Sequence, residues 1–169
     1  MKKSGLVILV LAVMFSSCIK KTDNSCNTAA PTAVATAQET AYLQNYITTN
    51  NITNAVLVNG MYYAITTQGT GTSPNICSTL AVRYTGNLIN GTTDGAQFDA
   101  STSTVNLNLS QLIIGWQLVM PQLKSGGTIT LYIPPSLGYG SQPRTNSAGA
   151  VVIPANSYLK FVVNLDNVQ

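Results

Sequence analysis

The chain has 169 residues, only 8% of them charged, and its eight Lys and Arg residues against five Asp and Glu residues give a formal net charge of +3. Histidine is absent from the sequence, which excludes histidine-based acid–base catalysis, a Ser-His-Asp triad and a histidine-ligated metal site. Lys2 and Lys3 lie in a segment that we expect to be removed. The remaining chain is then close to neutral, and nucleic-acid binding has no electrostatic support.

The first residues have the pattern of a targeting segment. Lys2 and Lys3 are followed by an almost wholly apolar run over residues 6–15, and two serines precede Cys18. The apolar run is shorter than the roughly 20 residues of a membrane-spanning helix, and the pattern is typical of a secretory signal. We therefore predict that residues 1–17 are a signal peptide and that the protein is exported.

The motif Phe15-Ser16-Ser17-Cys18 resembles the lipobox of bacterial lipoproteins, in which the cysteine becomes the lipidated first residue. The alternative is an ordinary cleaved signal followed by a chance cysteine. Two or three acyl chains on Cys18 would anchor the protein firmly in a membrane, facing the periplasm or the cell surface. Residues 18–36 have no large apolar period, so we expect a flexible tether between this anchor and the rest of the chain.

Two further cysteines, Cys26 in the tether and Cys77, leave two alternatives open. An exported protein meets an oxidising space, which permits a disulfide between them. The other alternative is two unpaired thiols. The unpaired state is slightly favoured, because nothing in the sequence of the tether brings Cys26 towards Cys77.

Residues 37–51 predict an amphipathic helix, because large apolar side chains recur at helical spacing at Tyr42, Leu43, Tyr46 and Ile47. Such a helix either lies on the neighbouring domain, which we favour, or serves as a dimerisation or partner helix. We assign residues 37–59 to this helix and its connection, and residues 60–169 to one domain.

Alternating apolar and polar residues predict several strands in this domain. Asn90-Gly91 and Asp94-Gly95 are turn signals. One short helix begins near Trp116 and is limited by Pro121, since proline in a helix interior removes a backbone donor. Strands are expected at residues 61–67, 80–88, 105–109, 128–134 and 159–166, with a polar loop at 141–150. A sheet that buries one face with a single helix curls around that helix. We therefore predict an α+β fold, with an antiparallel five- to six-stranded sheet curled around one short helix and an extra N-terminal helix.

The stretch from residue 113 to residue 140 contains four motifs in succession: Gly115-Trp116, Gly126-Gly127, Tyr132-Ile133-Pro134-Pro135 and Gly138-Tyr139-Gly140. Other motifs frame it, namely Val82-Arg83-Tyr84-Thr85-Gly86, Phe98-Asp99-Ala100-Ser101, Ile153-Pro154 and Phe161. In this order, the motifs resemble the signature of the FKBP-type peptidyl-prolyl isomerases. The resemblance covers about 110 residues and implies the same curled-sheet architecture.

The resemblance implies a peptidyl-prolyl cis-trans isomerase that assists folding of exported or envelope proteins. It would act on proline-containing polypeptides, non-covalently, through an aromatic proline pocket, and would need no cofactor or metal. Binding of macrolide inhibitors is a further implication. One alternative is an FKBP-like peptide-binding or chaperone module with little catalytic turnover. Another is a surface adhesin or structural lipoprotein, which would leave the aromatic motifs unexplained.

The resemblance also assigns roles to residues. Trp116 would form the floor of the pocket, and the Tyr139 hydroxyl and the Ile113 backbone N–H would donate to substrate carbonyls. Asp99 would act by charge and hydrogen bonding, not as a nucleophile. The other pocket residues would be Tyr84, Phe98, Leu112, Ile153 and Phe161. Val105 stands where the family often has a phenylalanine wall, so that side is expected to be more open.

Overall fold

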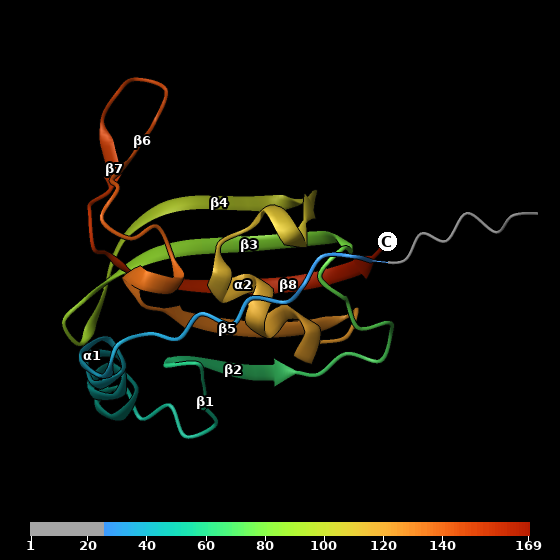
Figure 1. Cartoon of the computed structure of the whole chain (residues 1–169), viewed down its shortest axis with the longest axis horizontal. Helices are drawn as coiled ribbons and strands as arrows, with labels where there is room; N and C mark the ends of the chain where they lie inside the picture. Colours follow the sequence, from blue (N-terminus) through green and yellow to red (C-terminus); the bar gives the residue numbers. More distant parts are fainter. Residues whose placement is uncertain (1–25) are drawn as a thin grey trace, which may run out of the picture.

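The structure, a computed structural model, describes residues 26–169 (Figure 1). The predicted signal peptide and lipidation site lie outside the described residues. A six-stranded antiparallel sheet has the strand order β1-β2-β5-β8-β3-β4. Its strands are β1 (Val56–Val58), β2 (Met61–Thr67), β3 (Thr79–Asn90), β4 (Thr93–Asn108), β5 (Gly127–Ile133) and β8 (Tyr158–Val168). The sheet curls around one short helix, as predicted from the sequence.

Helix α2 (Ile114–Val119) lies in the curve of the sheet and fills the main core. Gly115 allows its close approach, because a Cβ at this position would lie 2.8 Å from side-chain atoms of Ile133 on β5. The helix gives way to a 3₁₀ turn over Met120–Gln122, which contains Pro121. This is the predicted limit to its length, because proline cannot continue the hydrogen-bond ladder of an α-helix.

Helix α1 (Ala37–Thr49) packs on the opposite face of the sheet. Its buried side chains Leu43, Tyr46 and Ile47 form a second core cluster with Tyr62 and Tyr132, among others. The prediction that this helix lies on the neighbouring domain is therefore confirmed. None of the helices within residues 26–169 has the length and apolar character needed to cross a bilayer.

Several details of the strands differ from the prediction. Asn90-Gly91 is the turn between β3 and β4, with Gly91 at φ +63°, whereas Asp94-Gly95 lies within β4. The second turn signal is overridden because Asp94 pairs with Ile89 across the strands. The short edge strand β1 was not predicted. The polar loop at 141–150 contains β6 (Arg144–Thr145), which pairs with β7 (Val151–Ile153) as a separate two-stranded sheet.

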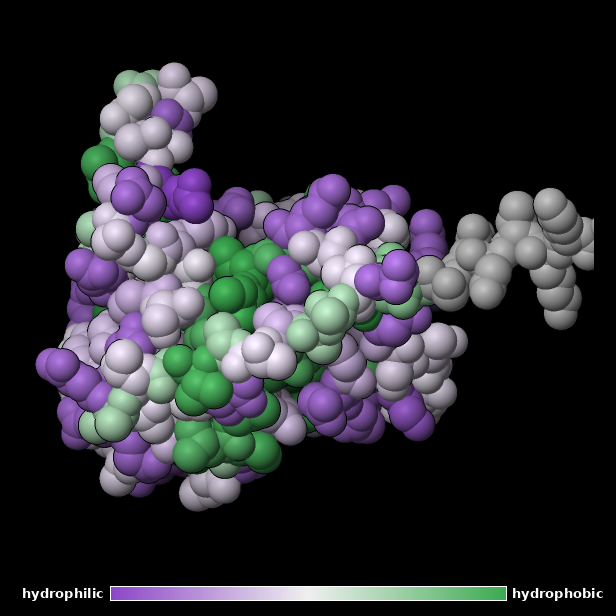
Figure 2. Space-filling view, in the orientation of Figure 1, coloured by the Kyte–Doolittle hydropathy of each residue, from purple (hydrophilic) through white to green (hydrophobic). Residues whose placement is uncertain are grey.

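The described part of the predicted tether, residues 26–36, lies along the domain and ends at α1 (Figure 1). Cys26 forms a disulfide with Cys77, with the two Cα atoms 5.6 Å apart. Near its other end, the Ala35 N–H donates to the Asn59 carbonyl, and the Asn59 side chain donates to the Ala33 carbonyl, both at 2.9 Å. Figure 2 shows apolar surface on both sides of the segment. The slight preference for unpaired thiols was wrong, because Cys26 and Cys77 are joined by a disulfide.

The Glu39 carboxylate connects α1 to the loop that follows β5. It accepts hydrogen bonds from the Ser136 backbone N–H and hydroxyl, both at 2.8 Å, and from the Thr36 backbone N–H at 2.9 Å. Thr36 and Glu39 also form a capping box at the start of α1. Burial opposes the negative charge, but the hydrogen bonds from Thr36 and Ser136 outweigh it and lower the pKa of Glu39.

We expect removal of the disulfide to destabilise the protein. The bond joins residues 51 positions apart, and closing a loop of that length in the unfolded chain corresponds to about 4 kcal/mol in a chain-entropy description. The double variant Cys26→Ser, Cys77→Ser should therefore unfold at lower urea concentration than the oxidised wild type. A reducing agent should produce the same loss in the wild type and leave the variant unchanged. If alkylation and mass spectrometry detected free thiols at both Cys26 and Cys77 in the folded oxidised protein, the disulfide would be contradicted.

Glu39→Gln should lower the free energy of unfolding at pH 7 by about 1 kcal/mol, because a neutral amide accepts fewer and weaker hydrogen bonds at a partly exposed site. Since the folded-state pKa of Glu39 is lowered, its contribution is complete above the unfolded-state pKa and is lost as pH falls through the folded-state pKa. The difference between wild type and variant in urea unfolding should therefore shrink below about pH 4. Gln38→Ala, at an exposed neighbouring position, is the matched control and should change stability little at either pH.

Candidate active site

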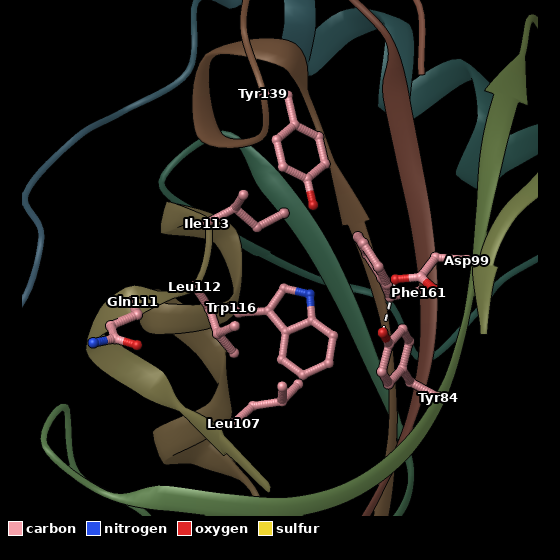
Figure 3. Close-up of a pocket in the computed structure, with 9 residues that line it drawn as sticks. All are labelled: Tyr84, Asp99, Leu107, Gln111, Leu112, Ile113, Trp116, Tyr139 and Phe161. Atoms are coloured by element: carbon pink, nitrogen blue, oxygen red, sulfur yellow. Dashed lines mark hydrogen bonds between the residues drawn. The ribbon is translucent and has the colours of Figure 1, made fainter. Parts of the chain in front are cut away.

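A cavity of about 150 Å³ opens between α2 and the inner face of the sheet (Figure 3). Trp116 faces Tyr84 and Phe161 across it, and Leu107 lies beneath the indole ring. Seven of the nine lining residues belong to the predicted site. The lining residues are Tyr84, Asp99, Leu107, Gln111, Leu112, Ile113, Trp116, Tyr139 and Phe161.

Aromatic rings in edge-to-face contact build the floor of the cavity. Trp116 is 3% exposed, and its ring centroid lies 5.4 Å from that of Phe161 and 5.9 Å from that of Tyr84. Phe98 packs edge-on against the other side of Phe161, also at 5.4 Å. Gly86 permits this packing, because a Cβ there would lie 2.7 Å from Phe98 and 2.9 Å from Phe161. Edge-to-face pairs are favoured by the ring quadrupoles, so the floor is apolar and fixed in shape.

Asp99 lies at the edge of this aromatic floor on β4, where it pairs with Gly86 on β3, two residues beyond Tyr84. The Tyr84 hydroxyl donates to the Asp99 carboxylate at 2.7 Å, the bond drawn in Figure 3. Burial, this hydrogen bond and the charge of Asp99 together raise the pKa of Tyr84. Tyr84 therefore stays protonated at neutral pH and holds Asp99 in place as a hydrogen-bond donor.

Tyr139 reaches the cavity from the loop between β5 and β6, with its hydroxyl pointing towards the aromatic residues (Figure 3). The loop is fixed by a 3₁₀ turn over Pro135–Leu137, by the buried Leu137, and by a Gly140 N–H bond to the Pro135 carbonyl at 2.9 Å. Burial raises the pKa of Tyr139, against a smaller lowering by Arg144 and with a further rise from Asp99. Its hydroxyl donates to no residue among those described, so it remains available to a ligand.

Ile113 lines the cavity at the start of α2. Its backbone is extended, with φ −60° and ψ 152°, and it precedes the helix without a side-chain cap. No described residue accepts a hydrogen bond from its N–H. The Gln117 side chain donates to the Leu112 carbonyl at 2.6 Å and so holds the preceding turn in place. The start of the helix thus leaves a backbone donor at a residue that lines the same cavity as Tyr139.

The two remaining predicted residues, Phe98 and Ile153, line a second cavity of about 480 Å³. It shares Asp99 and Tyr139 with the first cavity and is completed by Arg144, Asn146 and Val152. The structure therefore brings all nine predicted residues together, but in two adjoining spaces.

Sequence reasoning missed Leu107, Gln111 and Arg144. Leu107 and Val105 both pack partly buried against the core, but only Leu107 lines the first cavity. Both are apolar positions of one alternating strand, so a period of two could not show which of them reaches the cavity. Gln111 had no such signal and turns away from the aromatic rings in Figure 3. Arg144 is the only charged residue in the polar loop at 141–150, and that isolation could have singled it out.

Known proteins resemble this chain in sequence and in fold. The sequence pattern of FKBP-type peptidyl-prolyl cis-trans isomerases matches residues 71–166. The chain is 37% identical over 116 residues to the peptidyl-prolyl cis-trans isomerase Mip of Coxiella burnetii, covering 67% of this chain and 46% of Mip. It is 40% identical over 114 residues to FK506-binding protein 1 of Gibberella zeae, covering 64% of this chain and 98% of that protein.

The crystal structure of FkpA from Escherichia coli aligns with a TM-score of 0.59 and 30% sequence identity, over 78% of this chain and 62% of FkpA. The chain spans about a third to a half of the length of the first curated bacterial relatives. The matched pattern nevertheless covers more than half of this chain and includes the residues that line the first cavity. The protein belongs to the family of FKBP-type peptidyl-prolyl cis-trans isomerases.

Proposed function

We propose that the protein catalyses cis–trans isomerisation of Xaa–Pro peptide bonds, and that it assists folding of exported or envelope proteins. The observation that carries this proposal is the aromatic cavity around Trp116, with the free hydroxyl of Tyr139 and the carboxylate of Asp99 at its edge. A proline ring is compact and apolar, and the indole face offers it a flat floor. Family membership supports the same activity.

The chemistry follows from the nature of the peptide bond. Conjugation gives the C–N bond partial double-bond character, so rotation faces a barrier of about 18–20 kcal/mol. At the twisted transition state conjugation is lost, and the carbonyl carries less negative charge than in the planar amide. An apolar cavity disfavours the more polar planar state relative to the twisted one, because it replaces water around the amide. A thousandfold acceleration requires about 4 kcal/mol.

Hydrogen bonds can supply the remaining part of this lowering of the barrier by holding the substrate in the twisted geometry. In the proposed mechanism the Tyr139 hydroxyl and the Ile113 N–H donate to carbonyl groups on the two sides of the reacting bond. Asp99, held by Tyr84, contributes through its charge and as a hydrogen-bond acceptor. No covalent intermediate forms in this scheme. Bonds of this kind accelerate the reaction only where they are stronger in the twisted state than in the planar state.

We expect the purified full-length protein to accelerate isomerisation of a short Xaa-Pro peptide, measured by NMR exchange spectroscopy. Tyr139→Phe should lower kcat/KM about fivefold to tenfold, the value of one hydrogen bond of about 1 kcal/mol or slightly more. Adding Asp99→Leu should lower it further. Because the pKa of Tyr139 is raised, its hydroxyl stays protonated and the wild-type rate should be nearly constant between about pH 6 and pH 9.

Tyr63→Phe is the matched control, because Tyr63 lies on β2 outside both cavities. It should leave the rate unchanged. The macrolide FK506 should inhibit the wild type if the aromatic cavity also takes macrolides, as the name of the fungal relative indicates for that protein. No acceleration at micromolar concentrations of folded protein would reject catalysis. Retained binding of proline peptides in that case would identify a peptide-binding module with little turnover.

We further propose that the mature protein is a lipoprotein anchored through Cys18. The proposal rests on the sequence alone, in which the small residues of the lipobox-like motif place cleavage directly before this cysteine. In cells expressing the full chain, palmitate label should be incorporated into the wild type but not into Cys18→Ser. The variant should also leave the membrane fraction. Label that persists in Cys18→Ser, or a wild type that never carries label, would exclude this anchor.

A further inference from the structure

We propose that Arg144 and the second cavity form a subsite for an acidic side chain close to the proline of the substrate. This inference rests on the proposed function, because it concerns the residues that flank the isomerised bond. The second cavity is lined by Phe98, Val152 and Ile153 on its apolar side, and Arg144 and Asn146 bring polar groups to it. It therefore fits a side chain with an apolar stem and a negatively charged end.

The two cavities adjoin at Asp99 and Tyr139, which line both. One end of a peptide whose proline ring lies on Trp116 can therefore continue past Tyr139 into the second cavity. The Arg144 guanidinium carbon lies 4.8 Å from the centre of the Tyr139 ring. A guanidinium stacked on an aromatic face keeps its N–H donors free at its edge. The cation is thus held at the point where the peptide leaves the proline pocket.

The hairpin that carries Arg144 is fixed by its own hydrogen bonds. Arg144 pairs with Ile153 across β6 and β7, and this hairpin projects beyond the end of the main sheet (Figure 1). The Asn146 side chain accepts from the N–H groups of Ala148 and Ala150, both at 3.0 Å. Gly149, at φ +79°, completes the turn. A short, internally bonded hairpin presents its cation in one position, which lowers the entropic cost of binding a partner.

No carboxylate within residues 26–169 neutralises Arg144. The two ion pairs in that range join Arg83 to Asp166 and Lys160 to Asp94, and the Arg144 side chain donates no hydrogen bond to a described residue. A planar guanidinium with free donors binds a carboxylate through two parallel hydrogen bonds. The chemistry of the exposed group therefore favours a Glu or Asp side chain, or a C-terminal carboxylate, in the bound peptide.

Asp99 is the opposing charge, since it faces the same cavity. On its own it would attract a basic substrate residue. One of its oxygens already accepts the Tyr84 hydroxyl, and it lies at the aromatic floor, where the proline binds. Arg144 lies further along the path of the peptide and has no partner there. We therefore infer that Arg144, and not Asp99, decides which charge the second cavity prefers in a bound side chain.

The test compares peptides that carry Glu, Gln or Lys either directly before the proline or directly after it. On one side of the proline, kcat/KM at low ionic strength should be about threefold to tenfold higher for Glu than for Gln, the range of a partly exposed ion pair. Lys should be poorer than Gln. The ratio of kcat/KM for the Glu peptide to kcat/KM for the Gln peptide should fall towards one in 1 M NaCl, where the Debye length is about 3 Å.

Arg144→Gln should abolish the preference for Glu over Gln, and Arg144→Glu should turn it into a preference for Lys. Lys124→Gln removes an equal charge at an exposed position outside both cavities and should leave the preference intact. Equal rates for all peptides, a preference for Lys in the wild type, or a Glu preference that survives Arg144→Gln would overturn the inference.

Peptide affinity, measured separately by NMR titration, distinguishes this failure from failure of the proposed function. If no peptide is isomerised but Glu peptides still bind more tightly than Gln peptides through Arg144, catalysis is rejected and the subsite stands. If all peptides are isomerised alike and bind alike, the activity stands and the subsite is rejected. Chemical-shift changes of Arg144 and Asn146 locate the bound side chain in either case.

Discussion

The structure depends on the contact between helix α2 and the curved face of the sheet. Gly115 lets the helix backbone approach Ile133 closely, and this approach places Trp116 against Phe161. The same burial closes the main core and creates the floor of the site, because the indole has one face in the core and one face towards the cavity. Stability and binding therefore share one set of side chains. A change that loosens the helix would alter the shape of the floor before it unfolded the domain.

The segment that begins at Cys26 and the helix α1 that follows it contact the domain at two different places. The disulfide of Cys26 fixes the segment that leads to α1, and α1 covers the outer face of the sheet with its own apolar cluster. Glu39 then reaches from α1 to Ser136, three residues before Tyr139. Packing of the helix and placement of the loop are thus linked by one carboxylate. Because Ser136 and Tyr139 share a short turn with the buried Leu137, order in α1 favours order at the edge of the site.

Sequence patterns predicted those parts of the fold that local physics decides. The strand predicted at residues 61–67 has the bounds of β2, and Pro121 limited α2 as expected. Patterns failed where distant contacts decide. Asp94-Gly95 has turn chemistry but lies within β4, where Asp94 pairs with Ile89, and the disulfide of Cys26 with Cys77 joins residues 51 positions apart. The nine predicted site residues were assigned through the order of family motifs. Arg144 belongs to no such motif, and its role depends on a hairpin that brings it over Tyr139.

The aromatic floor and the edge of the site therefore differ in what fixes their side chains. The floor is built from strands and α2, whose side chains are fixed by the requirement to fill a core, and it suits the one ring common to all substrates. The edge is built from the β5–β6 loop and the β6–β7 hairpin, where polar and charged residues replace one another at little cost in stability. Under the proposed function, recognition of proline follows from the fold, whereas the proposed discrimination between neighbouring residues follows from side chains such as Arg144. A domain with the same aromatic floor and a different hairpin would keep the reaction and change the preferred sequence.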